Sequence, residues 1–95
     1  MKVRWTHPAS LDLKHLQDHI AQENPRAAYN IASLIREDVN QLADHPYSGR
    51  GGRVEGTREL VVSETPYIVA YRITSKSVDI LAVIHGARKW PEHLE

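Results

Sequence analysis

The sequence predicts an α+β domain in which a short strand and two helices precede three strands. Two observations lead to this expectation. Apolar residues recur at steps of three or four between residues 9 and 42, which is the spacing of amphipathic helices. Beyond residue 56, three apolar runs rich in β-branched residues are separated by hairpin-length turns, which is typical of strands. The order β-α-α-β-β-β predicts an antiparallel sheet with an N-terminal helical hairpin packed on one face.

The first predicted elements are a strand and a helix. Residues 2–6, KVRWT, alternate polar and apolar side chains and place Val3 and Trp5 on one face of a strand. The HPAS segment then ends the strand and puts Pro8 near the first turn of a helix, where proline is tolerated. The apolar face of this helix consists of Ala9, Leu13, Leu16 and Ile20.

The second helix begins at a recognisable start signal. Asn24 suits the N-cap and Pro25 the first helical position. The helix ends before Pro46, which disfavours helical backbone at His45. Its apolar stripe consists of Ala28, Ile31, Ile35, Val39 and Leu42, so the two helices are expected to form a hairpin.

A glycine-rich loop at 48–56 separates the helices from strands predicted at 57–62, 66–73 and 77–84. The last strand is apolar at nearly every position apart from Asp79. Strands covered on both faces have this composition, so we expect it to lie inside the sheet.

The bulk composition limits the classes of function. The chain has 95 residues, which suits a single domain over residues 1–95. It has no cysteine, which excludes disulfides and thiolate metal sites and fits the cytoplasm, and no long apolar run indicates a membrane span. Twelve basic and twelve acidic residues cancel, whereas proteins that bind nucleic acid through its phosphates usually carry a basic excess.

Two motifs in the chain resemble ligand sites only in part. His15 and His19 share a helix face at a spacing that suits a metal, but no third ligand is evident, so we predict no metal site. The GRGGR segment lacks the lysine and the following helix of a phosphate loop. It is expected to be a flexible connection, although Arg50 and Arg53 leave contact with an anion open.

The strands carry a more suggestive basic group. A hairpin centred near residues 64–66 would place Arg58 opposite Arg72, and such like charges require a compensating anion. His85 ends the last strand and is expected beside these arginines, which would keep its imidazole neutral and able to act as a base. Two interpretations stay open, namely an anion or phosphodiester site that also includes Arg88, and salt bridges at a sheet edge.

The second half of the chain resembles a known family. The segments GTREL (56–60), PYIVAYR (66–72) and IHGARKWP (84–91), in this order, are similar to the ParE/RelE superfamily of bacterial toxins from type II toxin–antitoxin modules. The resemblance implies this fold and a cognate antitoxin that forms a hetero-oligomer with the toxin. It implies no cofactor.

The superfamily divides by target, and the alternatives carry different site residues. ParE-like members inhibit DNA gyrase without known catalysis, and the motif spacing and neutral charge are closer to them. RelE-like members cut mRNA on the ribosome, and catalysis would then fall to Arg58, Arg72, His85 and Arg88. An inactive antitoxin-binding partner is the third alternative. The surface expected to bind target or antitoxin comprises Arg50, Arg53, His85, Arg88, Lys89 and Trp90.

Overall fold

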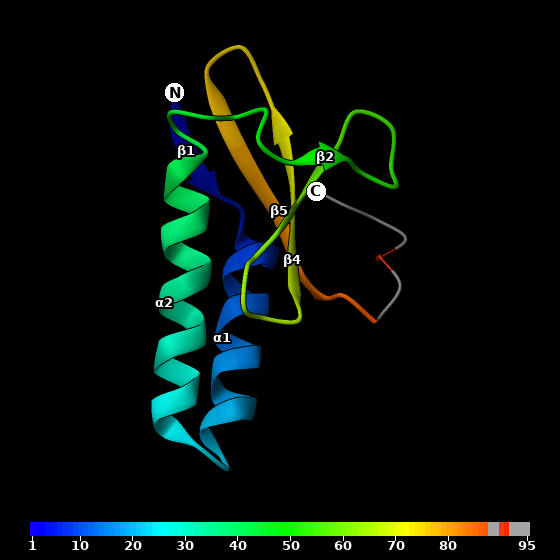
Figure 1. Cartoon of the computed structure of the whole chain (residues 1–95). Coiled ribbons are helices and arrows are strands. Elements are labelled where there is room, and N and C mark those ends of the chain that lie inside the picture. Colours follow the sequence, from blue (N-terminus) through cyan, green and yellow to red (C-terminus); the bar gives the residue numbers. More distant parts are fainter. Residues whose placement is uncertain (88–89, 92–95) are drawn as a thin grey trace.

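A computed structural model describes residues 1–87 and 90–91 of the chain. Two helices lie on one side of a five-stranded sheet whose strand order is β1-β5-β4-β3-β2 (Figure 1). The elements, in chain order, are β1 (Lys2–Trp5), α1 (His7–Ala21), α2 (Pro25–Gln41), β2 (Arg50–Gly51), β3 (Arg58–Val61), β4 (Tyr67–Ile73) and β5 (Ser77–His85).

The predicted α+β class and the helical hairpin are confirmed, and two details of the sheet are corrected. The sheet is mixed, because β1 runs parallel to β5 while the other pairs are antiparallel. Parallel strands must be joined by a long connection. Here the connection from β1 to β5 consists of α1, α2 and strands β2 to β4. The expected loop at 48–56 also contributes β2, whose two residues pair with Glu59 and Arg58.

Both helices begin at polar caps. The Thr6 hydroxyl accepts the amide of Ala9 at 3.4 Å and donates to the Ile80 carbonyl at 2.7 Å, which ties the start of α1 to β5. The Asn24 side chain accepts the amide of Ala27 at 3.1 Å, so the predicted cap before Pro25 is confirmed. These caps satisfy amides that a helix N-terminus otherwise leaves unpaired.

The main core lies between the helices and the sheet. The predicted stripes supply its helical side, and Tyr71, with no exposed surface, supplies the largest buried side chain of the sheet. The Tyr71 hydroxyl donates to the Pro46 carbonyl at 2.7 Å and accepts the Gly49 amide at 3.0 Å. The chain that leaves α2 is therefore fixed to the sheet at Tyr71, as a buried phenol usually requires a partner.

The opposite face of the sheet has a smaller apolar cluster of Ala70, Ala82 and Ile84, against which Trp90 packs. The interior position expected for β5 is confirmed, since the strand lies between β1 and β4 and its residues from Val78 to Ile84 are buried. Among the described residues, neither helix has the length and apolar character needed to cross a bilayer.

Candidate functional site

The basic group expected on the strands is not assembled as predicted. Arg58 pairs with Tyr71, one residue short of Arg72. Neighbouring residues of a strand point to opposite faces, so Arg58 lies on the helix-covered face and Arg72 on the other. His85 pairs with Tyr67, four residues along β4 from Tyr71, which corresponds to roughly 13 Å. The expectation that His85 neighbours these two arginines is therefore wrong.

Arg58 contacts the loop that follows α2. Its guanidinium donates to the carbonyls of Tyr47, at 3.2 Å, and Gly49, and lies 5.2 Å from the centre of the Tyr47 ring. Its Nε is buried and has no hydrogen-bond partner among the described residues. Two backbone carbonyls and an aromatic ring thus bind the Arg58 guanidinium, which links β3 to the loop after α2.

Arg72 lies on the open face of the sheet, opposite Asp79 in the register of β4 and β5. Asp79 also pairs with Arg4 of β1, through two bonds of 3.1 Å, and accepts the Ser77 hydroxyl at 2.7 Å. The Arg4 bonds, followed by the Ser77 bond and the charges of Arg4 and Arg72, lower the pKa of the Asp79 carboxyl. A carboxylate therefore offsets the positive charge here, as the salt-bridge interpretation requires.

The other predicted binding residues include Arg50 in β2 and Arg53 three positions later. Arg50 forms an ion pair with Glu59 on β3, and Arg53 is exposed in the loop between β2 and β3. Arg88 and Lys89 lie outside the described residues. The structure therefore places Arg50, Arg53 and His85 in three separate surroundings.

His85 instead faces the first helix across a groove of about 620 Å³. Its ring meets Tyr67 edge to face at 5.6 Å, and its Nδ1 accepts the amide of Ala87 at 3.2 Å, which places the proton of the neutral imidazole on Nε2. The α1 wall of this groove, which we call the histidine groove, includes Asp12, His15, Leu16 and His19, and the sheet wall includes Tyr67, Val83 and His85.

The predicted pair His15 and His19 thus shares the histidine groove with His85. Within the described part of the chain, no three His, Asp or Glu side chains are arranged to hold a metal ion. Three imidazole side chains nevertheless line one groove.

Asp12 is the residue of this groove that sequence reasoning missed. Its carboxylate accepts the Val83 amide at 3.0 Å, at a point where β1 has already left the edge of β5, because the last pair is Trp5 with Ile80. Burial raises the pKa of the Asp12 carboxyl, and the Val83 bond and the charge of His15 partly oppose this effect. Only a position between Leu11 and Leu13, at the margin of the apolar stripe, distinguishes Asp12 in the sequence.

The comparisons with known proteins agree with one another. The family model described as the ParE toxin of the type II toxin–antitoxin system parDE matches residues 3–90. This chain belongs to the ParE toxin family. It is therefore a toxin of a type II toxin–antitoxin system, and its family implies an antitoxin as partner.

Similar proteins support this membership of the ParE family. The chain is 42% identical to “Putative toxin Y4kP” of Sinorhizobium fredii over 93 residues, which cover 98% of this chain and 96% of that protein. It is 36% identical to “Toxin RelE2” of Caulobacter vibrioides over 87 residues, covering 92% and 97%. The solved chromosomal ParDE system of P. aeruginosa has a chain with a TM-score of 0.82 and 28% identity, covering 90% of this chain and 95% of that chain.

Trp90 of the ParE-like segment IHGARKWP packs against the sheet of the toxin itself. Trp90 is half-buried against Ala70, Ala82 and Ile84, and its indole lies so close to Gly52 that a side chain there would collide with it. Trp90 thus joins the open face of the sheet to the loop after β2. The expectation that Trp90 also contacts a partner stays a prediction.

Proposed function

We propose that this ParE-family toxin inhibits bacterial growth in the cytoplasm by binding DNA gyrase, without catalysing a reaction, and that a cognate antitoxin neutralises it. The observation that carries this proposal is the separation of three of the four candidate catalytic residues, the fourth, Arg88, lying outside the described residues. Arg58 is engaged with the Tyr47 and Gly49 carbonyls on one face, Arg72 lies beside Asp79 on the other, and His85 lies in the histidine groove.

Cleavage of a phosphodiester requires a different arrangement. Cations must lie within hydrogen-bond distance of the phosphate on which charge develops, and a general base must reach the attacking hydroxyl at the same time. Arg58 and Arg72 lie on opposite faces of the sheet. Both lie several residues along the strands from the pair that His85 forms with Tyr67. The separation of these three side chains therefore favours a toxin that binds its target without cleaving RNA.

Two assays on the purified toxin test the proposal. With gyrase and plasmid DNA, we expect loss of supercoiling and accumulation of gyrase–DNA complexes. In a coupled translation reaction we expect intact mRNA. Unchanged supercoiling at micromolar toxin, together with cleaved mRNA, would overturn the proposal. Induced expression without growth arrest would instead indicate an inactive, antitoxin-binding protein.

A ribosome-dependent endoribonuclease is the second candidate function. It is favoured by the 36% identity to a protein named as the toxin RelE2 and by the imidazoles that face one groove. In that case His85→Ala should reduce mRNA cleavage by about a hundredfold or more, as loss of a catalytic group does. The matched control is His45→Ala, because His45 is exposed after α2 and lies away from the groove.

We also propose that the antitoxin covers the histidine groove and the adjoining edge of β5. In the described chain no strand pairs with this edge beyond Ile80, and an extended segment of a partner can add to such an edge through backbone hydrogen bonds. His85, the first residue of the predicted patch, lines the histidine groove. The toxin and antitoxin would then form a hetero-oligomer.

Hydrogen exchange on the toxin with and without the product of the neighbouring gene tests this docking site. We expect the amide of His85 to exchange more slowly in the complex, while the amides of β3 serve as the internal control. If the amide of the strand edge exchanged at the same rate in the free toxin and in a complex of proven stoichiometry, the proposed docking site would be refuted. The assignment of gyrase as the target would not be affected.

A further inference from the structure

A second hollow lies on the other flank of α1, where this helix meets α2. This crevice has a volume of about 440 Å³ and is lined by Trp5, Ser10, Leu13, Lys14, Gln17 and Arg36. Its size falls within the range of roughly 300–1,000 Å³ that small-molecule sites occupy. The crevice shares no lining residue with the histidine groove, where the antitoxin is proposed to bind.

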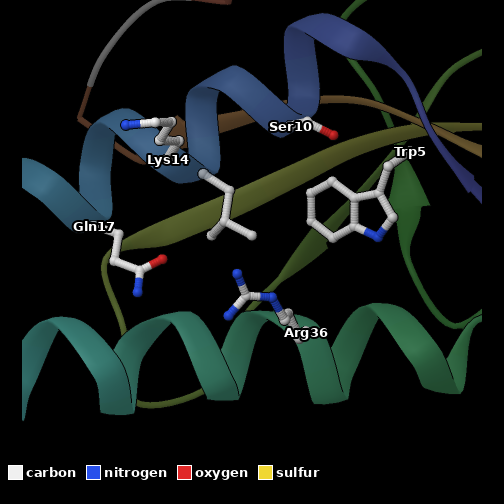
Figure 2. A pocket seen from close by; sticks show the side chains of 6 residues that line it. Trp5, Ser10, Lys14, Gln17 and Arg36 are labelled. Carbon is white, nitrogen blue, oxygen red and sulfur yellow. The ribbon is translucent and has the colours of Figure 1, made fainter.

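The floor of the crevice is apolar and firmly placed. Leu13 is only 6% exposed and belongs to the main core, and Trp5 packs against the same core. The backbone of Trp5 is fixed by pairing with Ile80. Figure 2 shows the Trp5 indole between the two helices, and Leu13 lines the same crevice. An apolar or aromatic body that fits between the helices would therefore contact a rigid surface.

The charged groups of the crevice are all positive. None of its six lining residues is acidic, and two of them, Lys14 and Arg36, are cations. The Lys14 ammonium is engaged with Asp18 at 2.8 Å. Among the described residues, Arg36 has no hydrogen-bond or ion-pair partner. Its guanidinium extends from α2 to lie between Gln17 and Trp5, directly beside the apolar floor (Figure 2).

We propose that this crevice binds a small organic carboxylate with an aromatic or branched apolar body. The carboxylate accepts hydrogen bonds from the Arg36 guanidinium, which presents a planar set of donors suited to this group. The body packs on Trp5 and Leu13, and Gln17 and Ser10 offer further polar contacts at the rim. A compact inorganic anion would leave the apolar floor unused, so the structure favours an amphipathic ligand.

Nuclear magnetic resonance on the full-length chain tests the proposal with 3-phenylpropionate as the probe. We expect saturable shifts of the Trp5 indole N–H and the Arg36 Nε–H. The Trp90 indole, on the opposite face of the sheet, serves as the internal control and should not shift. The uncharged 3-phenylpropanamide should bind at least about tenfold more weakly, because it loses the charge-assisted bond.

Variants locate the binding. Arg36→Gln should weaken binding of 3-phenylpropionate by about tenfold or more, whereas Arg26→Gln, at an exposed position of the same helix outside the crevice, should leave it unchanged. If Arg36→Gln alters the fold, the amide probe on the unmodified chain gives the same test. Equal shifts at Trp5 and Trp90, or equal affinity for acid and amide, would overturn the proposal.

Discussion

The two flanks of α1 differ in what the opposite wall offers. Toward α2 the opposite wall is a helix that contributes one lining residue, Arg36, above an apolar floor. Toward β5 the opposite wall is a strand edge that β1 has left, and Asp12 binds its backbone at Val83. One helix thus borders two hollows of different character, one facing a helix side chain and the other facing a strand edge.

The largest effect is expected where the crevice floor meets the core. Leu13→Ala removes a side chain that is only 6% exposed and should lower the free energy of unfolding by about 2–5 kcal/mol. Leu16→Ala is the matched change on the other flank, and it should cost less because Leu16 is half-buried. Urea unfolding measures both. Equal losses would show that the two flanks do not differ in packing.

The next largest effect concerns the carboxylate on the strand edge. Asp12→Ala leaves the partly buried Val83 amide without its acceptor, which should destabilise the fold by about 1–2 kcal/mol and speed hydrogen exchange at Val83. Asp12→Asn retains a side-chain oxygen and should preserve most of the protection. An unchanged Val83 exchange rate in Asp12→Ala would contradict the role assigned to this carboxylate.

The acid limb of the stability curve separates Asp12 from Asp79. Because the pKa of Asp79 is lowered from its ordinary value of 3.8, this carboxyl contributes stability above pH 3.8, and the contribution is lost as the pH falls through the folded pKa. The raised pKa of Asp12 acts in the opposite sense, because the folded state binds the proton more tightly as the pH falls toward 3.8.

Urea unfolding between about pH 6 and pH 3 checks these signs. Asp79→Asn should flatten the loss of stability in acid, and Asp12→Asn should steepen it. Two parallel shifts of the same sign would contradict the assigned causes, and unmodified protein in the same buffers is the control.

The smallest effect is expected at the exposed pair of the crevice rim. Lys14 and Asp18 lie one helical turn apart with side chains 69% and 62% exposed, so Lys14→Gln should change stability by no more than about 0.5 kcal/mol. A double-mutant cycle with Asp18→Asn isolates the pair. A coupling energy above about 1 kcal/mol would show that this rim is more rigid than its exposure indicates.

Local signals made the helices predictable. Each apolar stripe repeats over several turns, and Asn24 and Pro25 mark a helix start by their own chemistry. The parallel pairing of β1 with β5 was not predictable in this way. Residues 2–5 carry no information about a strand more than 70 positions away, because that pairing depends on where the hairpin and the meander bring the chain.

The predicted pairing of Arg58 with Arg72 was wrong because the register between β3 and β4 differs from the expected one by one residue. The turn between β3 and β4 includes Glu64 at a φ of 67°. Glycine and asparagine favour this left-handed conformation, so a glutamate in the sequence does not predict it. The resulting register pairs Arg58 with Tyr71 in place of Arg72 and sends the two arginines to opposite faces. His85 was correctly expected at the end of its strand, but its neighbours on α1 depend on how the helix packs against the sheet.

The bond between Asp12 and Val83 has a consequence for self-association. A bare strand edge allows two copies of a chain to pair through their backbones, and folded proteins commonly protect such edges with charged side chains. Here the carboxylate occupies the Val83 amide, so a second copy must displace a charged group to pair at this position. The carboxylate that accepts the Val83 amide thereby disfavours pairing of this strand edge with the same edge of a second copy.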